Sequence, residues 1–334
     1  MQAGKLPFDL LSRMLGKIEI SDPRVVVGAR PGVDAAVIYA GDRYLVTKTD
    51  PITFATDSIG WYVVQVNAND IAVTGATPKW MMATLLLPEG IEAARVEAIF
   101  DQLLAACRDL GITLVGGHTE VTYGLPRPIA VGALLGEVEK HRLVLSSGAR
   151  AGDSIVVTKG IAIEGSAILA QEAPERLAAA GVSAATIARA RGWLQTPGIS
   201  VVRDCAVALA AGGVRAMHDP TEGGLAGGLS EMAAASGLGA EIDLERVPVF
   251  PECAEICRAA GLDPLGLIAS GSLLAAVAPT SVDAVTSALA GAGIPAVEIG
   301  RFTPAGSGLL ARSGGKAAPM PAFARDEIAR FFSA

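Results

Sequence analysis

The sequence predicts an α/β protein of two domains, each with a mixed sheet. A chain of 334 residues is long enough to build two hydrophobic cores. Strand and helix patterns alternate through the first half, and a segment of small and turn-forming residues at 146–153 (SSGARAGD) interrupts the pattern near the middle. We therefore expect one domain over residues 1–148 and a second over residues 149–334.

In the first domain, apolar spacing predicts four strands and two helices. The expected strands are 44–49 (YLVTKT), 81–87 (MMATLLL), 112–115 and 129–138, and the expected helices are 59–73 and 91–110, the second ending at Gly111. The strands carry apolar residues on both faces, whereas one layer of helices covers only one face. A partner must bury the other face, so we expect a homodimer.

The second domain is expected to open with a strand at 154–158. Helices follow at 165–180, 184–194 and 199–211, then a strand at 214–218, a glycine-rich turn and a helix at 225–236. Further strands are expected near 240–244, 268–277 and 296–302. The segment PECAEICRAAG and residues 323–332 are each expected to form a helix.

Composition narrows the class of protein. The net charge is −7 and no basic run occurs, which argues against nucleic-acid binding. No apolar run approaches the roughly 18 residues needed to cross a bilayer, and the N-terminus lacks the apolar core of a signal peptide, so we expect a cytoplasmic protein. Cys107, Cys205, Cys253 and Cys257 form no CxxC pair, which favours buried, reduced thiols over a zinc site.

Four acids stand at the ends of expected elements, each beside small residues. They are Asp34 in PGVDAAVI, Asp50 in TKTDPITF, Asp70 in VNANDIAVTG and Asp219 in HDPTEGG. Pro51 is expected to stop the strand ladder and leave the Asp50 carboxylate at a strand end. Carboxylates converging from separate elements hold a hard divalent cation beside a polyphosphate, so these acids are candidate metal ligands.

Two other motifs each allow a purely structural and a functional interpretation. Asn67, Asn69 and Asp70 in the helix at 59–73 form either a solvated stripe or a polar edge that faces a cleft. In HDPTEGGLAGG, the glycines at 223, 224, 227 and 228 start a helix whose free amides could bind an anion. The same glycines could instead serve only a tight turn and close helix packing.

A resemblance to known proteins extends over nearly the whole chain. It rests on the following segments, in this order along the sequence: GVDAAVI, TD, VNANDIAVTGATPKW, VGGHTEV, GARAGDSIVVTKG, HDPTEGGLAGGLSEMAAASG and ASGSLLAAV. The chain resembles the PurM-like superfamily of aminoimidazole ribonucleotide (AIR) synthase, the hydrogenase maturation protein HypE, selenophosphate synthetase and thiamine-monophosphate kinase. It looks most similar to HypE and to AIR synthase-related proteins. The resemblance implies a first-domain sheet that forms a β-barrel with that of a second subunit. It also implies ATP in a cleft, its phosphates reached through Mg²⁺ by aspartates.

Carried over position by position, the resemblance makes Asp34, Asp50, Asp70 and Asp219 the metal contacts. Cofactor contacts are assigned to Asn69 and Asp70, to Gly117, His118 and Thr119, and to Gly223 and Gly224. Asp70 and His118 are also the candidate catalytic residues.

Three departures from the family pattern bear on the reaction. Val33 replaces the first acid of a GDDAA-type motif, and His118 replaces the acid of GDT or GET. The sequence ends DEIARFFSA, without the C-terminal cysteine on which HypE carries the group that it dehydrates. With two fewer carboxylates, we expect fewer magnesium ions at the site.

The leading functional hypothesis is therefore an ATP-dependent enzyme that phosphorylates or activates a small substrate. The first alternative is a small-molecule kinase resembling thiamine-monophosphate kinase. The second is a non-catalytic nucleotide-binding partner of other proteins in metallocofactor maturation.

His118, in VGGHTEV, is the motif residue with the most open role. A metal-binding His–X–Glu pair lacks a third ligand of the zinc type nearby, and a satisfied structural histidine is a second possibility. The family match favours a third role, in which a protonated imidazole contacts the γ-phosphate or the substrate.

Overall fold

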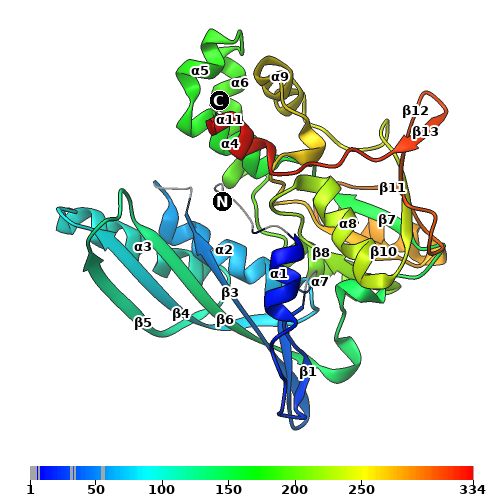
Figure 1. The fold of residues 1–334 in the computed structure, drawn as a ribbon, viewed down its shortest axis with the longest axis horizontal. Helices are drawn as coiled ribbons and strands as arrows, with labels where there is room; N and C mark the ends of the chain where they lie inside the picture. The colour runs from blue at the N-terminus through cyan, green and yellow to red at the C-terminus, as the bar shows by residue number, and fades with distance from the viewer. Residues whose placement is uncertain (1–5, 7, 31–32, 34, 54–56, 334) are drawn as a thin grey trace. The chain divides into compact units, whose positions relative to one another are not determined.

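The computed structural model describes residues 6, 8–30, 33, 35–53 and 57–333. The chain forms two compact units, each built around one mixed sheet with helices, so the α/β prediction is confirmed (Figure 1). Residues 19–29 and 34–143 make up the sheet unit of the first half, and residues 1–18, 30–33 and 144–334 make up the other. The expected division placed residues 1–18, 30–33 and 144–148 with the first half, whereas this division places them with the second. Asp34 lies outside the described residues.

The first-half unit has a six-stranded sheet in the order β1-β2-β3-β6-β4-β5. Its strands are β1 (Val25–Val27), β2 (Ala36–Ala40), β3 (Arg43–Ile52), β4 (Thr77–Pro88), β5 (Thr113–Thr122) and β6 (Ile129–Glu139). All neighbouring strands are antiparallel except β4 and β5, which are parallel. The strands β1 and β2 were not predicted.

Helices α2 (Ile59–Ala72) and α3 (Ala93–Asp109) cover one face of this sheet (Figure 1). Along β4 and β6, buried side chains alternate with partly exposed ones, as expected for a sheet with one covered face. The second face is apolar but open in the single chain. Met82 on β4 is 43% exposed there, beside the half-buried Val131 and Leu135 of β6.

Two expectations about strand ends were wrong. Strand β3 does not stop at Pro51, because Asp50, Pro51 and Ile52 continue in register opposite Gly132, Val131 and Ala130 of β6. Strand β5 runs through the whole VGGHTEV motif instead of ending before it. Its parallel pairing with β4 extends from Trp80–Thr113 to Pro88–Thr122, which keeps the glycines within the ladder.

The second unit has a seven-stranded sheet in the order β13-β12-β9-β11-β7-β10-β8. Its strands are β7 (Ser154–Thr158), β8 (Val214–His218), β9 (Gly239–Asp243), β10 (Leu274–Val277), β11 (Ala296–Thr303), β12 (Leu309–Ser313) and β13 (Lys316–Pro319). Only β9 and β12 are parallel. The last two strands were not predicted, and the strand expected at 268–277 is confined to its last four residues.

The helices of this unit are α1 (Phe8–Leu15), α4 (Ile163–Glu172), α5 (Pro174–Ala179), α6 (Ala184–Arg191), α7 (Val202–Ala211), α8 (Gly224–Ser236), α9 (Pro251–Ala260), α10 (Val282–Gly291) and α11 (Glu327–Ser333). The single helix expected at 165–180 is two helices, because Pro174 cannot continue α4 and becomes the first residue of α5. Ile155 and Val157 of β7 pack with α8, whereas Thr158 points to α7, so these two helices lie on opposite faces of the sheet.

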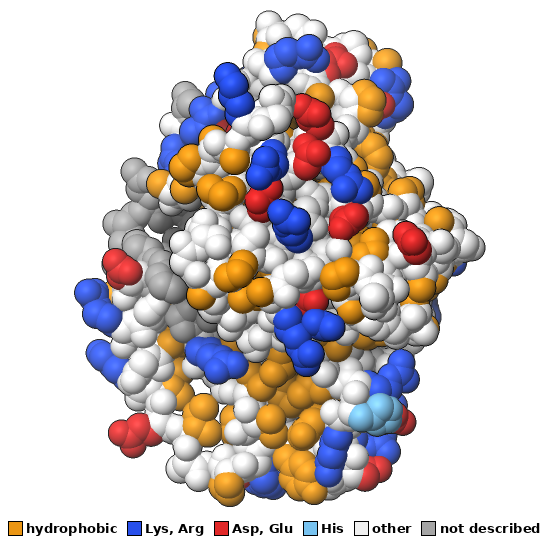
Figure 2. All heavy atoms as spheres, turned by 90° about the vertical axis from the view of Figure 1, so that its right-hand side faces the viewer, with side chains coloured by type: hydrophobic (Ala, Val, Ile, Leu, Met, Phe, Trp, Pro, Cys, Tyr) orange, Lys and Arg blue, Asp and Glu red, His pale blue; other side chains and the backbone are white. Residues whose placement is uncertain are grey.

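The surface shows charges of both signs. On the face drawn in Figure 2, lysine and arginine side chains lie among aspartates and glutamates, and hydrophobic side chains gather in the lower part. Within the described part of the chain, every helix is too short or too polar to span a bilayer.

Candidate functional site

Two predicted site residues of the first unit, Asp50 and Asp70, converge on one lysine. The ammonium of Lys48 lies 3.3 Å from Oδ2 of Asp50 and 3.2 Å from Oδ2 of Asp70. Lys48 and Asp50 share a face of β3 because they are two residues apart, and Asp70 reaches them from the last turn of α2. The convergence of the two carboxylates was expected. The lysine between them was missed, although its spacing from Asp50 was visible in the sequence.

The polar residues of α2 are buried, so the alternative of a solvated stripe is wrong. Asn67 and Asn69 have no exposed surface, and Asp70 is 4% exposed. Nδ2 of Asn67 donates to the carbonyl oxygens of Val63, at 2.8 Å, and of Asp50, at 3.3 Å. Its Oδ1 accepts from the Asp50 N–H at 2.9 Å. Burial is possible because these polar atoms have partners within the protein.

The same contact explains a glycine. A Cβ on Gly132 of β6, which pairs with Asp50, would overlap the side-chain amide of Asn67. Glycine at this position lets α2 approach the sheet closely enough for Asn67 to reach the backbone of β3. The carboxylates of Asp50 and Asp70 are therefore positioned by packed, hydrogen-bonded elements.

The donor set suits a hard cation. Carboxylate oxygens are the ligands that Mg²⁺ prefers, and this ion commonly takes one or two carboxylates while phosphates and water complete its shell. Asp50 and Asp70 already point at one position of positive charge, that of the Lys48 ammonium. Among the described residues, no group of three or more His, Cys, Asp or Glu side chains could hold a metal ion. The residues thus fit a magnesium ion that reaches the site with its phosphate ligands.

The VGGHTEV motif lies on the exposed edge strand β5. His118 and Glu120 point to the same side, with Nε2 of His118 3.0 Å from Oε2 of Glu120, and both side chains are about half exposed or more. Thr119, between them, is also exposed. Gly117 has a φ of 154°, and a Cβ there would overlap the carbonyl oxygen of Ala83 on β4. The glycine permits the parallel pairing that presents the histidine.

In the second unit, most of the buried polar side chains lie at one edge of the sheet, where the ends of three neighbouring strands meet. Strands β7 and β8 end there, and β10, which lies between them, begins there with Leu274 opposite both Val157 and His218. The buried polar side chains around this edge are Thr158, Lys159, Glu164, Ser166, Asp204, His218, Asp219, Ser270 and Ser272. This concentration of buried polar side chains makes the edge the second candidate region.

Asp219, a predicted site residue, is buried at this edge, and sequence reasoning missed the histidine beside it. Asp219 is 1% exposed and His218 is 4% exposed. Nε2 of His218 lies 2.8 Å from Oε2 of Glu231 on α8, and its Nδ1 lies 3.9 Å from Oδ1 of Asp219. The histidine therefore lies between two carboxylates and is within hydrogen-bond distance of the Glu231 carboxylate. The sequence signal was its place next to Asp219 at the end of a predicted strand.

The glycine-rich start of α8 already holds a carboxylate of the same chain. The N–H of Gly223 donates to Oδ2 of Asp326 at 2.7 Å, and Oδ1 accepts from the N–H of Ile328 at 2.8 Å. A Cβ on Gly224, whose φ is 62°, would lie 2.5 Å from the carbonyl oxygen of Leu265. Close packing thus requires Gly224, and the anion at Gly223 is Asp326, a residue that the motif gave no means of finding.

Glu164 in the first turn of α4 is a second carboxyl group at this edge. It is 5% exposed, and its Oε2 has no hydrogen-bond partner among the described residues. Burial raises the pKa of Glu164 to about 8, a hydrogen bond from Ser270 works against this rise, and the nearby acids Glu222, Asp326 and Asp219 add to it. Glu164 therefore holds its proton near neutral pH.

The four cysteines are all free and buried, as predicted. Burial raises the pKa of Cys107 to about 11 and that of Cys205 well above its usual range. Sγ of Cys253 lies 3.9 Å from Sγ of Cys257 on one face of α9. Burial and a raised pKa make Cys107 and Cys205 poor nucleophiles in the folded chain.

Comparison with known proteins agrees with the fold and with the motifs. Residues 32–138 match the family model of the AIR synthase related protein N-terminal domain, and residues 150–310 match that of the C-terminal domain. The carbamoyl dehydratase HypE of Rhizobium leguminosarum bv. viciae is 33% identical over 260 residues, which cover 76% of this chain and 69% of that protein. The chain therefore belongs to the AIR synthase-related family, within the PurM-like superfamily of ATP-dependent enzymes, and it is similar to HypE.

Solved structures share the fold. The hydrogenase maturation protein HypE in complex with ATP superposes with a TM-score of 0.74 at 22% identity, covering 95% of this chain and 96% of that one. The protein ThiL in complex with AMPPCP and TMP superposes with a TM-score of 0.72 at 22% identity, covering 94% of each chain.

Proposed function

We propose that this protein binds ATP with Mg²⁺ and phosphorylates or otherwise activates a small substrate, using Asp50 and Asp70 as the metal and phosphate contacts. The observation that carries the proposal is the convergence of these two carboxylates on a single position of positive charge, held by Lys48. Family membership supports it, since the relatives include a carbamoyl dehydratase and structures solved with ATP or AMPPCP.

The residues of this site have separable roles. Magnesium, when bound, supplies the positive charge that offsets the phosphates. Asp50 and Asp70 would hold the magnesium ion in position, and Asn67 fixes the strand that carries Asp50. Lys48 neutralises the two carboxylates and can donate a charge-assisted hydrogen bond to a phosphate oxygen.

The remaining assignments rest on the family resemblance and are part of the same proposal. Asn69 and Asp70, together with Gly117, His118 and Thr119, are assigned to the nucleotide. Asp219 is assigned to metal or phosphate contact at the end of β8. At Gly223 and Gly224, a phosphate would compete with Asp326 for the N–H of Gly223, so we assign these glycines a lesser role.

The test is ATP affinity in Asp50→Asn and Asp70→Asn, measured by calorimetry at saturating magnesium. Each substitution should weaken binding at least about tenfold, which corresponds to about 1.4 kcal/mol. Asp109→Asn, an exposed acid at the end of α3, is the control and should bind like the unmodified protein. Unchanged affinity in both site variants would refute the assignment.

The reaction itself has two enzymatic candidates and one alternative without turnover. If phosphate stays on an organic product, as phosphorus NMR would reveal, the protein is a small-molecule kinase. If ADP and free phosphate both appear, phosphorylation only activates the substrate. Binding without ADP release indicates a nucleotide-binding partner of another protein. The burial of all four cysteines disfavours chemistry on a thiol of this chain and favours a group supplied by a substrate or a partner.

We also propose that the open apolar face of the six-stranded sheet is buried in a homodimer. Met82, Val131 and Leu135 lie on this face, and α2 and α3 cover only the opposite one. A partner of the same sequence would remove this apolar surface from water.

A further inference from the structure

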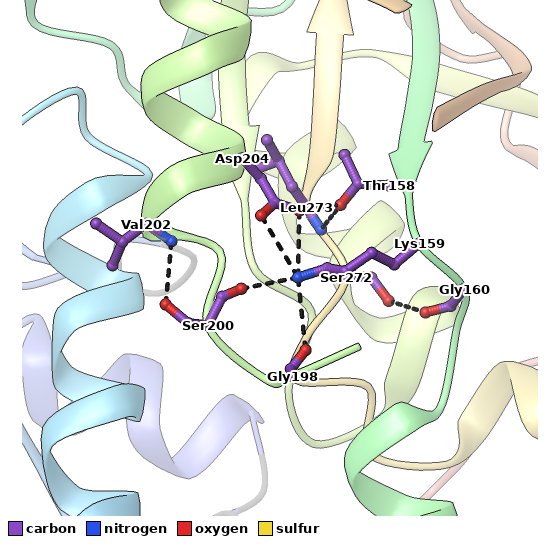
Figure 3. Close-up of polar contacts among 9 residues, drawn as sticks. All are labelled: Thr158, Lys159, Gly160, Gly198, Ser200, Val202, Asp204, Ser272 and Leu273. Carbon is purple, nitrogen blue, oxygen red and sulfur yellow. Dashed lines mark hydrogen bonds and ion pairs between the residues drawn. The ribbon is translucent and has the colours of Figure 1, made fainter. Parts of the chain in front are cut away.

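Lys159, which directly follows the last residue of β7, places its ammonium in a cage of oxygen atoms. Nζ of Lys159 lies 2.7 Å from the carbonyl oxygen of Ser200, 3.5 Å from that of Gly198 and 3.2 Å from Oδ1 of Asp204 (Figure 3). The lysine and aspartate side chains are only 6% and 4% exposed. Two backbone carbonyls and a carboxylate around one positive charge resemble the ligand set of a cation more than a surface ion pair.

The backbone of Lys159 is strained in a way that glycine would relieve. Its φ is 58°, in the left-handed region, where a residue with a Cβ costs about 1 kcal/mol or more. The strained conformation is held by a hydrogen bond from the Lys159 N–H to the carbonyl oxygen of Pro295, at 2.7 Å. A lysine in this conformation is best explained by what its side chain contacts.

The cage joins the end of β7 to the loop that precedes α7. Ser200 and Gly198 belong to this loop, and Asp204 lies in the first turn of α7. Oδ1 of Asp204 also accepts from Oγ1 of Thr158 at 2.7 Å. Without the ammonium, a buried carboxylate and two carbonyls would lose their shared partner, which is costly in a low-dielectric interior.

A second loop, 268–273, depends on the same strand end. The N–H of Leu273 donates to Oγ1 of Thr158 at 3.0 Å, and Oγ of Ser272 donates to the carbonyl oxygen of Gly160 at 2.5 Å (Figure 3). Gly271 packs directly on the first loop, since a Cβ there would lie 3.0 Å from the carbonyl oxygen of Gly198. The loop continues to Ser270, which hydrogen-bonds Glu164.

We propose that Lys159 is a positioning residue whose ammonium serves as the resident monovalent cation of an oxygen-lined site. From this site it sets the conformation of the loops at 198–200 and 268–273. Once the side chain is removed, the cage would accept a potassium, ammonium or primary alkylammonium ion. Measurements of stability test this cation site by itself, whereas measurements of turnover also rest on the proposed function.

The experiment compares Lys159→Gly with Lys159→Met. Glycine suits the left-handed backbone and leaves the cage empty, whereas methionine fills much of the same volume without a charge. The thermal midpoint of each variant is measured in the chlorides of potassium, ammonium, n-butylammonium, sodium and tetramethylammonium at equal ionic strength. We expect a saturable rise for Lys159→Gly in potassium, ammonium and n-butylammonium, and no rise in tetramethylammonium, whose methyl groups keep the charge away from the oxygen atoms. Lys159→Met should show no such rise.

The turnover arm uses ADP release in the same salts. Lys159→Gly should lose at least about tenfold in kcat/KM and regain most of it with n-butylammonium. A rise in the thermal midpoint without any ADP release from the unmodified protein would retain the cation site and reject the proposed function. An equal response of Lys159→Gly and Lys159→Met to all five salts would reject the cation site.

A second measurement covers the case in which Lys159→Gly fails to fold. Asp204→Asn keeps the shape of the side chain but removes the charge that faces the ammonium. Amides in 198–200 and 270–273 should then exchange with solvent faster. Arg203→Gln, an exposed neighbour on the same helix turn, should leave them unchanged. Identical exchange in the two variants would overturn the positioning role.

Discussion

The side-chain amide of Asn67 hydrogen-bonds both backbone polar groups of Asp50, accepting from its N–H at 2.9 Å and donating to its carbonyl oxygen at 3.3 Å. Among the described residues, β2 pairs with β3 as far as Thr47, so the Asp50 backbone lies beyond the last β2 partner described on that side. Asn67 therefore supplies the backbone hydrogen bonds that a neighbouring strand supplies elsewhere in the sheet. The helix residue satisfies the backbone that presents a candidate metal ligand.

Asn67→Ala should lower the free energy of unfolding by about 1–3 kcal/mol, because buried backbone groups lose their partners. A double-mutant cycle with Gly132→Ala tests whether the contact is direct, since a Cβ on Gly132 would overlap the Asn67 amide. Gly132→Ala should cost less in the Asn67→Ala background than in the unmodified protein. Additive costs in urea denaturation would contradict the arrangement.

The helical spacing of apolar residues in α2 was predictable from the sequence, but the contacts of its polar side chains were not. Asn67 is bonded to a backbone 17 residues away in sequence, and periodicity carries no information about such a partner. The Lys48–Asp50 spacing on one strand was a usable local signal, whereas the contact of Lys48 with Asp70 depends on how α2 packs. Asp326 at the start of α8 comes from 103 residues further along, beyond any local pattern.

Glu164→Gln should make the protein more stable at alkaline pH. The pKa of Glu164 is raised from its ordinary value of 4.5 to about 8, so the folded state binds a proton that the unfolded state releases. Stability contributed by this group is therefore full below about pH 4.5 and is lost as the pH rises toward 8. Gln removes the ionisation while keeping a group that can hydrogen-bond Ser270.

We expect Glu164→Gln to gain at least about 1 kcal/mol over the unmodified protein at pH 8, and much less at pH 5. Urea midpoints at the two pH values measure the difference. Glu175→Gln, an exposed acid on α5, is the control and should show no pH-dependent gain. A Glu164→Gln variant that loses stability equally at both pH values would show that the carboxyl group is not protonated in the fold.

Met82→Asp should dissociate the proposed homodimer. Met82 lies on the open apolar face of the six-stranded sheet, and a charge there would have to be buried in the interface. Phe100→Asp on α3 is a matched control, because both side chains are 43% exposed. Light scattering at micromolar concentration should give a dimer for the unmodified protein and for Phe100→Asp, and a monomer for Met82→Asp. A monomeric unmodified protein would refute the dimer.

His118→Ala should flatten the pH dependence of ATP binding while leaving the fold intact. His118 is exposed on β5 and lies 3.0 Å from Glu120, so it is accessible to a ligand and its loss removes no buried contact. Only the protonated imidazole can donate to a phosphate as a cation, so ATP affinity should be higher at the acidic end of the pH range than at the alkaline end. His141→Ala is the matched control, because His141 is also exposed and lies 3.5 Å from Glu139, likewise two residues away. ATP affinity is measured by calorimetry from pH 6 to pH 8. If His118→Ala keeps the affinity, the pH profile and the turnover of the unmodified protein, as His141→Ala should, the histidine serves only the structure of β5.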